Sequence, residues 1–323
     1  MNRFKIKALS LTVLGLGLMF QSCTDDESYQ RPATRPNKPL TALPAKSFAL
    51  AEQARNAIVI LDAATQQVVW EWTAVEAKVP AGFSRWFVGP TEAKPVYNNK
   101  YILMTASGGA VALIRIADKK LMFYANCGGN PHSAEMLPDG NIVTAESKKG
   151  EINTFVVDTV KVLGTKANTL KIGNAHNVIW SQEQQCLYAT GTMTAGNTAV
   201  FRFKYNNDAA HPKLLNQKRI YTFAKENGGH DLYPVYGEKG KLWLTAAHAV
   251  YKIDVSRAEV TCDKIYDMPD IKGICNDAEG VYMLSPTEEW WAEGLINDKG
   301  EQIFRLNGSR IYKGRIMINQ PLP

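Results

Sequence analysis

The fold is decided by the stretch His132-Ser-Ala-Glu-Met-Leu-Pro-Asp-Gly-Asn-Ile-Val143, because it opens a unit that returns along the chain. Further copies begin at His176 and His230, and each runs through turn residues into a second apolar segment. Short runs rich in Val, Ile, Tyr, Phe and Trp alternate with Gly, Asn, Asp and Pro, which indicates an all-β protein. The unit repeats about every 40 to 50 residues, a period typical of propeller blades.

The strand pattern predicts a six-bladed β-propeller. In blades two to six we expect four strands each, and the first strands begin at residues 94, 133, 177, 231 and 273. The N-terminal copy supplies three strands, Phe48–Ala51, Ile58–Asp62 and Val68–Trp72, and lacks a first one. We expect the C-terminal segment Arg310–Ile318 to complete that blade, which leaves no open sheet edge in the ring. The alternatives are seven blades, for which residues 73–91 are too few, and a β-sandwich, which would repeat every strand or hairpin.

The first residues of the chain predict export. A basic region over Asn2–Lys7 precedes an apolar run over Ala8–Phe20, which is too short to cross a bilayer comfortably. Cys23 follows, and its placement resembles that of the bacterial lipoprotein cysteine, which becomes the lipidated first residue of the mature chain. We therefore predict a signal peptide over residues 1–22, a lipidated Cys23 with a Pro-rich tether over 23–45, and a propeller domain over 46–323. A secretory signal without lipidation is the alternative.

An acidic run, Thr24-Asp-Asp-Glu27, directly follows Cys23. It is similar to the signal that sends lipoproteins to the cell surface in gut-type Gram-negative anaerobes, although an acidic linker without that role would look the same. We predict an outer-membrane lipoprotein at the cell surface, with the periplasmic face as the alternative.

Charge and cysteine content exclude some classes of partner. The formal net charge of +6 is scattered among acids apart from the basic start of the chain, so we predict no nucleic-acid partner. Beyond Cys23 no cysteines stand at C-x-x-C spacing, and both buried thiols and disulfides stay open for the remaining four, Cys127, Cys186, Cys262 and Cys275.

Histidines recur at one place in the predicted blades. The first strand of a blade lines the central channel, so residues at the starts of first strands share one rim. By alignment on the following strand, we expect this rim to carry Glu92, His132, His176, His230, Lys272 and Arg310. Neutral imidazoles beside a carboxylate suit a divalent ion, and we predict that His132, His176, His230 and Glu92 hold Mn²⁺, Zn²⁺ or Ca²⁺. The alternative is structural, with polar residues that hydrogen-bond neighbouring blades.

Further side chains are predicted to share this face of the ring. His248 lies in a loop between second and third strands, and Glu146 ends a second strand. Tryptophans in a blade-six loop would stack on sugar rings, although such residues ordinarily cover the outer core of a blade. We assign substrate binding to His248, Glu146, Trp290, Trp291 and Arg310. We assign to Lys272 and Arg85 the handling of a proton or a substrate carboxylate.

Two phrases carry a resemblance to a known family. Asn130-Pro-His-Ser-Ala-Glu-Met-Leu-Pro-Asp-Gly140 and Ile58-Val-Ile-Leu-Asp-Ala-Ala-Thr-Gln-Gln-Val-Val-Trp70 resemble blades in a family of uncharacterised propeller lipoproteins from gut anaerobes. The second phrase is also similar to quinoprotein-type blades. The resemblance covers residues 46 to 318 and implies the architecture far more than an activity. Oligogalacturonate lyases are similar as propellers with a histidine-held Mn²⁺, but a Gln completes their cluster where Glu92 stands here, so the likeness is an analogy of fold and site.

These observations predict an exported, membrane-anchored propeller that binds a carbohydrate or similar polar ligand at the channel mouth. A histidine-held divalent metal with lyase or hydrolase activity is the enzymatic form of this hypothesis. A non-catalytic glycan- or protein-binding scaffold is the alternative, and a sulfotransferase-like propeller with Arg85 and Arg310 around an anion is a third possibility. The sequence contains no G-x-S-x-G, no phosphate-binding Gly-rich loop that opens a helix, and no H-E-x-x-H.

Overall fold

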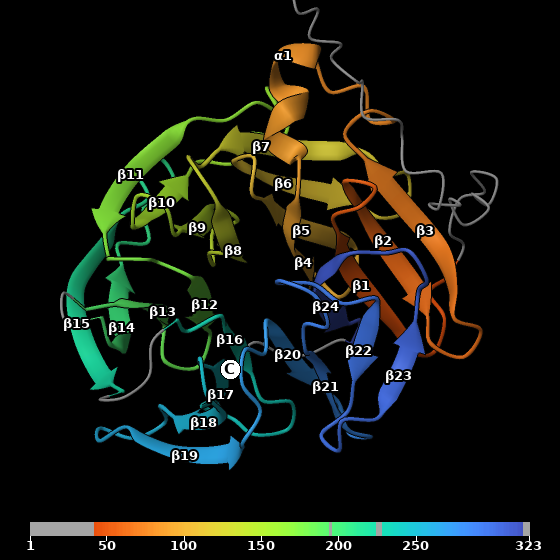
Figure 1. Cartoon of the computed structure of the whole chain (residues 1–323). Helices are drawn as coiled ribbons and strands as arrows, with labels where there is room; N and C mark the ends of the chain where they lie inside the picture. Colours follow the sequence, from red (N-terminus) through yellow and green to blue (C-terminus); the bar gives the residue numbers. More distant parts are fainter. Residues whose placement is uncertain (1–41, 194–195, 224–227, 319–323) are drawn as a thin grey trace, which may run out of the picture. The chain divides into compact units, whose positions relative to one another are not determined.

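The computed structural model describes residues 42–193, 196–223 and 228–318, which all belong to one compact unit. This part of the chain contains six antiparallel sheets of four strands each, arranged as blades around a central channel (Figure 1). The predicted six-bladed β-propeller is confirmed. The predicted signal peptide, Cys23 and nearly all of the predicted tether lie outside the described residues. Within the described part, no helix has the length and apolar character needed to cross a membrane.

Blades two to six each begin at the channel and run outward strand by strand. Blade two contains β4 (Pro90–Val96), β5 (Tyr101–Ala106), β6 (Ala110–Arg115) and β7 (Leu121–Asn126). Blade three contains β8 (Pro131–Met136), β9 (Ile142–Glu146), β10 (Glu151–Phe155) and β11 (Lys166–Lys171). Blade four contains β12 (Asn177–Ser181), β13 (Cys186–Thr192), β14 (Thr198–Tyr205) and β15 (Leu214–Thr222).

The strands of blades five and six are on average shorter than those of the preceding blades. Blade five contains β16 (Asp231–Pro234), β17 (Lys241–Thr245), β18 (Val250–Asp254) and β19 (Thr261–Tyr266). Blade six contains β20 (Gly273–Asn276), β21 (Val281–Leu284), β22 (Gly294–Ile296) and β23 (Gln302–Arg305). Most strand ends lie within a few residues of the predicted ones.

Blade one is built from both ends of the described chain. Its strands are β24 (Ile311–Ile316), β1 (Ser47–Glu52), β2 (Ala57–Asp62) and β3 (Gln67–Thr73), in that order from the channel outward. The antiparallel pairing of β24 with β1, with Gly314 opposite Leu50, closes the ring as predicted. The six inner strands contact one another in turn around the channel, in the order β24, β4, β8, β12, β16 and β20.

The apolar runs of the strands form the core between blades, as β2 illustrates. Ile58 and Ile60 pack into a cluster shared with blade two, whereas Val59 and Leu61 pack into a cluster shared with blade six. Successive side chains of a strand point to opposite faces, and both faces of a blade are covered. Each such side chain contributes about 1.5–3 kcal/mol by leaving water.

The segment between blades one and two contains the only helical turns in the described residues. They are α1 (Ala81–Ser84) and the 3₁₀ turn Arg85–Phe87, and neither was expected from the strand pattern. Phe87 is buried and packs against Trp72, so this segment covers the edge between the two blades. As predicted, no further blade lies there.

Candidate functional site

Three β-bulges decide which side chains stand at the rim of the channel. In blade three, the pairing of β8 with β9 skips His132. In blade two, the pairing of β4 with β5 skips Thr91 in the same way, so Thr91, and not Glu92, holds the position of His132. In blade one the skipped residue is Tyr312, and not Arg310. The predicted rim places of Glu92 and Arg310 are therefore wrong, because a bulge inserts one residue into one strand only and leaves no clear trace in a sequence alignment.

The other three rim positions are as predicted. His176, His230 and Lys272 each immediately precede an inner strand. Each donates its backbone N–H to the last paired residue of the neighbouring second strand, at N···O distances of 3.1, 2.9 and 2.9 Å. Tyr312, Thr91, His132, His176, His230 and Lys272 thus occupy corresponding places in blades one to six.

Three imidazoles gather in one cluster at this rim. The rings of His132 and His176 stack with centroids 4.5 Å apart and planes 10° from parallel, and His230 meets His176 edge to face at 5.7 Å. Lys272 Nζ lies 3.0 Å from Nε2 of His230, and Tyr312 Oη lies 2.9 Å from Nδ1 of His132. We call these five residues the histidine mouth. The sequence found four of them and missed Tyr312.

The hydrogen bonds assign a tautomer to each neutral ring. Asn130 Nδ2 donates to Nε2 of His132 at 2.9 Å, so the proton of His132 sits on Nδ1 and is donated to Tyr312. Nδ1 of His176 donates to the carbonyl of Asn174 at 3.0 Å, so its Nε2 keeps a lone pair that no described residue uses. His230 accepts from Lys272 on Nε2 and therefore carries its proton on Nδ1, which is buried and has no hydrogen-bond partner among the described residues.

Burial and positive neighbours keep the three imidazoles neutral. Burial lowers the pKa of His132 well below its ordinary value, and the neighbouring histidines and Lys313 lower it further. For His176, burial and then the charges of Lys313 and Lys272 bring the pKa to about 4. For His230, burial and then Lys272 bring it to about 3. The direction of these effects shows a positive potential at the mouth.

Lys272 is the source of much of that potential. Only 8% of its surface is exposed, and burial lowers the pKa of its ammonium group. Within the described residues its side chain forms no ion pair, and its hydrogen-bond partner is the neutral ring of His230. Asp270 raises this pKa from beyond ion-pair distance, and less than burial lowers it. A nearly buried cation with no carboxylate at ion-pair distance is unusual, because buried charges in proteins are normally paired.

Directly beneath the mouth lies a layer of paired charges, Glu92, Asp231, Lys313 and Arg315, all 0% exposed. Arg315 donates to both oxygens of Glu92, at 2.9 and 2.7 Å, and to both oxygens of Asp231, at 2.8 and 2.6 Å. Lys313 Nζ lies 3.2 Å from Asp231 and 3.2 Å from the carbonyl of His132. We call these four residues the ion-pair layer.

The charges of the ion-pair layer are held in their ionised forms. Burial alone would raise the pKa of Glu92 and of Asp231, but Arg315 and Lys313 outweigh burial and lower both. Gly273 leaves room for the chain of Lys313, since a Cβ there would lie 3.2 Å from its Cγ. Both oxygens of Glu92 therefore accept from Arg315, and its predicted role as a metal ligand stays a prediction.

The remaining predicted site residues fall into two groups. Arg310 and Trp291 lie together, with the guanidinium 5.2 Å from the ring centroid, and beside them Trp290 donates its indole N–H to Gln53 at 2.9 Å. Glu146 ends β9 in blade three, His248 lies between β17 and β18 in blade five, and Arg85 lies in the 3₁₀ turn before blade two. Glu146 is buried and accepts the backbone N–H of Lys149, while Arg85 is exposed on its 3₁₀ turn.

Among the described residues, no group of three or more His, Cys, Asp or Glu side chains is arranged to hold a metal ion. The four cysteines Cys127, Cys186, Cys262 and Cys275 are free thiols. Metal binding by the histidines stays a prediction.

Fold and site together define a six-bladed β-propeller with a polar channel, whose mouth gathers histidines and an unpaired lysine. Residues 4–322 match a family described as a family of unknown function, DUF6528, and the chain belongs to that family. The match confirms that the chain belongs to a family without an assigned function, and the fold confirms that it is a propeller. No curated protein matches the sequence.

Solved structures that resemble the chain support the architecture. A nidogen/laminin complex has a TM-score of 0.56 at 12% identity, covering 86% of this chain and 100% of that one. Hydrazine synthase of Kuenenia stuttgartiensis has 0.52 at 15% identity, covering 73% and 70%. A protein of unknown function from Bacteroides caccae has 0.51 at 13% identity, covering 88% and 100%. At such low identities the likeness concerns the fold alone.

Proposed function

We propose that the histidine mouth binds the anionic group of a polar ligand, and that this ligand is an acidic carbohydrate. One observation carries the proposal: Lys272 is a nearly buried ammonium group that has no carboxylate at ion-pair distance among the described residues, and Asp270 acts on it only from farther away. A bound carboxylate would supply that partner, and charge-assisted hydrogen bonds of this kind are among the stronger ones in proteins. Burial is the main reason that the imidazoles stay neutral, and the charges of Lys272 and Lys313, which add to this effect, also attract an anion.

The surroundings of the mouth support a sugar as the carrier of that anion. Trp290 is 48% exposed, and Arg310 and Trp291 lie beside it. All three belong to loops that enter inner strands or join second to third strands, which share one face of the ring with the mouth. Exposed indole rings stack on sugar faces, and an arginine recognises a second carboxylate.

The proposal is tested by binding. Galacturonate oligomers are titrated into the protein by calorimetry and compared with neutral oligomers of the same length. We expect binding of the acidic oligomers only, weakened about 10- to 100-fold by Lys272→Met because a charged hydrogen bond is lost. Lys299→Met, on an exposed loop between β22 and β23, removes the same charge from the opposite face and is the matched control. Equal binding by both variants would overturn the proposal.

A second candidate function at the same place is a lyase. The observation that favours it is the lone pair on Nε2 of His176, which no described residue uses. Beside a carboxylate held by Lys272, this nitrogen would take the proton from the adjacent sugar carbon. The electron pair then forms a C=C bond, and the glycosidic C–O bond breaks as its oxygen takes up a proton. We expect the wild type to form an unsaturated product that absorbs ultraviolet light, and His176→Ala to form none. Binding of the oligomers without product formation favours the non-catalytic scaffold.

A divalent metal at the histidines, Mn²⁺, Zn²⁺ or Ca²⁺, is the occupant that the sequence suggested. It would use Nε2 of His176 and would have to displace Lys272 from His230. The nearby charges of Lys272 and Lys313 oppose a dication there, so we place the anion first.

We further propose that the protein is exported and anchored by lipid on Cys23, at the cell surface. The basic and apolar segments that end at Cys23 support this, as does the acidic run after it. Metabolic labelling with a fatty acid should mark the wild type and not Cys23→Ala. Protease treatment of whole cells should then remove the protein if it faces outward, whereas protection would place it at the periplasmic face.

A further inference from the structure

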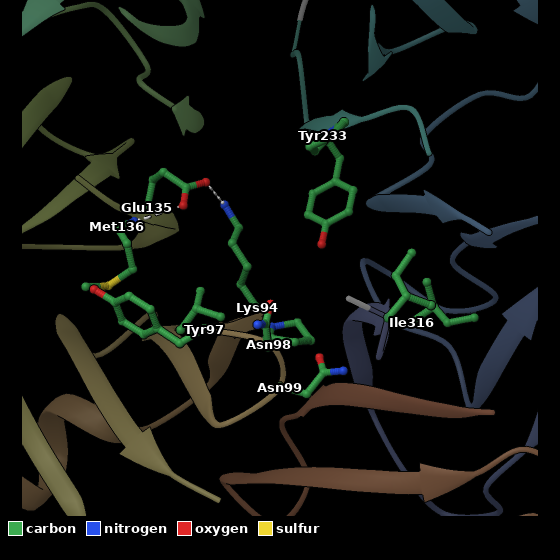
Figure 2. Close-up of a pocket in the computed structure, with 12 residues that line it drawn as sticks. Lys94, Tyr97, Asn98, Asn99, Glu135, Met136, Tyr233 and Ile316 are labelled. Atoms are coloured by element: carbon green, nitrogen blue, oxygen red, sulfur yellow. Dashed lines mark hydrogen bonds and ion pairs between the residues drawn. The ribbon is translucent and has the colours of Figure 1, made fainter. Parts of the chain in front are cut away.

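A pocket lies at the end of the channel opposite the histidine mouth. The inner strands run side by side from the histidine mouth, and a cavity of about 180 Å³ lies at their far ends (Figure 2). Lys94, Glu135, Tyr233 and Ile316 reach it from β4, β8, β16 and β24, and the turn after β4 adds Tyr97 and Asn98. We call it the distal pocket. The ion-pair layer separates it from the histidine mouth.

The charged groups of the distal pocket neutralise each other. Lys94 Nζ donates to Glu135 at 3.0 Å, drawn as a dashed line in Figure 2. The other oxygen of Glu135 accepts the backbone N–H of Met136 at 2.9 Å. Both side chains are nearly fully buried. Because no charge of the pocket is left unpaired, the pocket suits an uncharged ligand, in contrast to the histidine mouth.

Tyr233 supplies an open hydrogen-bond donor. Its ring is fixed by the guanidinium of Arg315, whose Cζ lies 4.0 Å from the ring centroid. Its hydroxyl points into the cavity in Figure 2 and forms no hydrogen bond with any described residue. Burial raises the pKa of this phenol, so the hydroxyl keeps its proton and remains a donor. A preformed donor at the wall of a cavity awaits an acceptor from a ligand.

The rim of the distal pocket is held in an uncommon backbone conformation. Tyr97, Asn98 and Asn99 follow one another in the left-handed region, with φ of 52°, 56° and 58°. Asparagine tolerates this region, but a tyrosine there is strained. Such strain persists where the surrounding structure or a function requires the side chain. Here it places the aromatic ring of Tyr97 at the pocket, next to Met136 (Figure 2).

We propose that the distal pocket binds an uncharged, hydroxylated ring of the size of one sugar residue. An apolar ring face packs on Tyr97, Met136 and Ile316, and a ring hydroxyl accepts from Tyr233. The paired Lys94 and Glu135 offer a neighbouring donor and acceptor, which matches two adjacent hydroxyls. The volume admits one ring and excludes a chain, because sites for larger ligands occupy about 300–1,000 Å³.

The test uses saturation-transfer NMR with glucose, galactose, mannose and N-acetylglucosamine, with glucuronate as the charged comparison, followed by titration of any sugar that binds. We expect at least one neutral sugar to bind and glucuronate not to compete with it. Tyr233→Phe should weaken binding about tenfold, since it removes one hydrogen bond and keeps the ring on Arg315. Tyr266→Phe, which removes a hydroxyl from the outer strand of the same blade, is the matched control.

Thermal unfolding of both variants confirms that the fold is intact. Three outcomes would overturn the proposal: no neutral sugar binds, Tyr233→Phe binds as the wild type does, or the neutral sugar is lost in Lys272→Met instead. The third outcome would place the sugar at the histidine mouth. Failure of galacturonate oligomers to bind leaves this test unaffected, because the two sites use different residues.

Discussion

The histidine mouth and the ion-pair layer are adjacent levels of one channel, yet they treat charge in opposite ways. In the ion-pair layer, Glu92 and Asp231 are matched by Arg315 and Lys313 with direct hydrogen bonds. In the mouth, Lys272 faces neutral imidazoles and forms no ion pair with any described acid, since Asp270 lies beyond ion-pair distance. Buried charges that are paired within the protein have a structural role. A buried charge without such a pair is stabilised when a ligand of opposite charge binds to it. The four predictions below test that difference, beginning with the largest effect.

Removing Arg315 should cost the most stability. Arg315→Met leaves two buried carboxylates with Lys313 as the only cation at ion-pair distance among the described residues. Loss of one partner of a buried ion pair costs about 3–5 kcal/mol. Urea unfolding followed by tryptophan fluorescence measures the loss. Arg305→Met, at an exposed ion pair with Glu293, is the control and should cost less than about 0.5 kcal/mol. Equal losses in the two variants would show that the layer is not structural.

The histidine mouth and the ion-pair layer should also lose their contributions to the free energy of unfolding in different pH ranges. The pKa of His176 is about 4 in the folded state against 6.5 ordinarily, so the unfolded state binds the proton more readily. Stability is therefore fully present above pH 6.5 and falls as the pH drops toward 4, by about 1.4 kcal/mol per pH unit for each such histidine. The carboxylates of the ion-pair layer have lowered pKa values, so their loss begins only below about pH 4.5.

Unfolding free energies are measured from pH 7 to 4.5. Burial raises the pKa of Glu135 and of Glu146, so their protonation in the folded state opposes the histidine effect, and the contribution of His176 is taken from the difference between wild type and variant. His176→Gln should flatten the slope, and His211→Gln, at an exposed loop on the other face, should leave it unchanged. A slope that survives in His176→Gln, with the full wild-type value, would mean that another group titrates in this window.

Lys272→Met should change stability by less than about 1 kcal/mol and in the favourable direction, because a desolvated cation without a partner is replaced by an apolar chain of similar length. The same urea titration that measures Arg315→Met provides the value. Should Lys272→Met cost as much as Arg315→Met, Lys272 would belong with the structural charges, and the comparison between the two levels would fail.

Metal removal should have the smallest effect. We expect an excess of chelator to leave the thermal unfolding midpoint unchanged, and elemental analysis to find no metal that distinguishes the wild type from His176→Ala. Stoichiometric metal that disappears in His176→Ala would instead restore the ion predicted from the sequence and would remove the anion from the mouth.

The ring itself could be predicted because its information is local and repeated. Turn residues and apolar runs mark each strand, and the missing first strand of blade one pointed directly to the C-terminus. The proximity of His132, His176 and His230 could also be predicted. Each lies at the start of an inner strand, and the ring brings these strand starts together at one end of the channel.

The finer placement at the rim could not be predicted. Thr91 and Tyr312 hold rim positions through bulges that depend on packing around the ring, and a shift of one residue turns a side chain to the other side of its strand. Lys313 and Arg315 appear in the sequence as ordinary polar residues of a final strand. Their partners Glu92 and Asp231 are over 80 residues distant, and only the assembled channel brings them within reach.

The strand β24 carries Tyr312, Lys313 and Arg315, and it is the last strand of the described chain to leave the ribosome. Without it, Glu92 and Asp231 lose their hydrogen-bonded cations, and His132 loses the hydroxyl of Tyr312. Ring closure and charge neutralisation are therefore a single late event. A chain without residues 311–316 would lack the strand that closes the ring and both cations of the ion-pair layer.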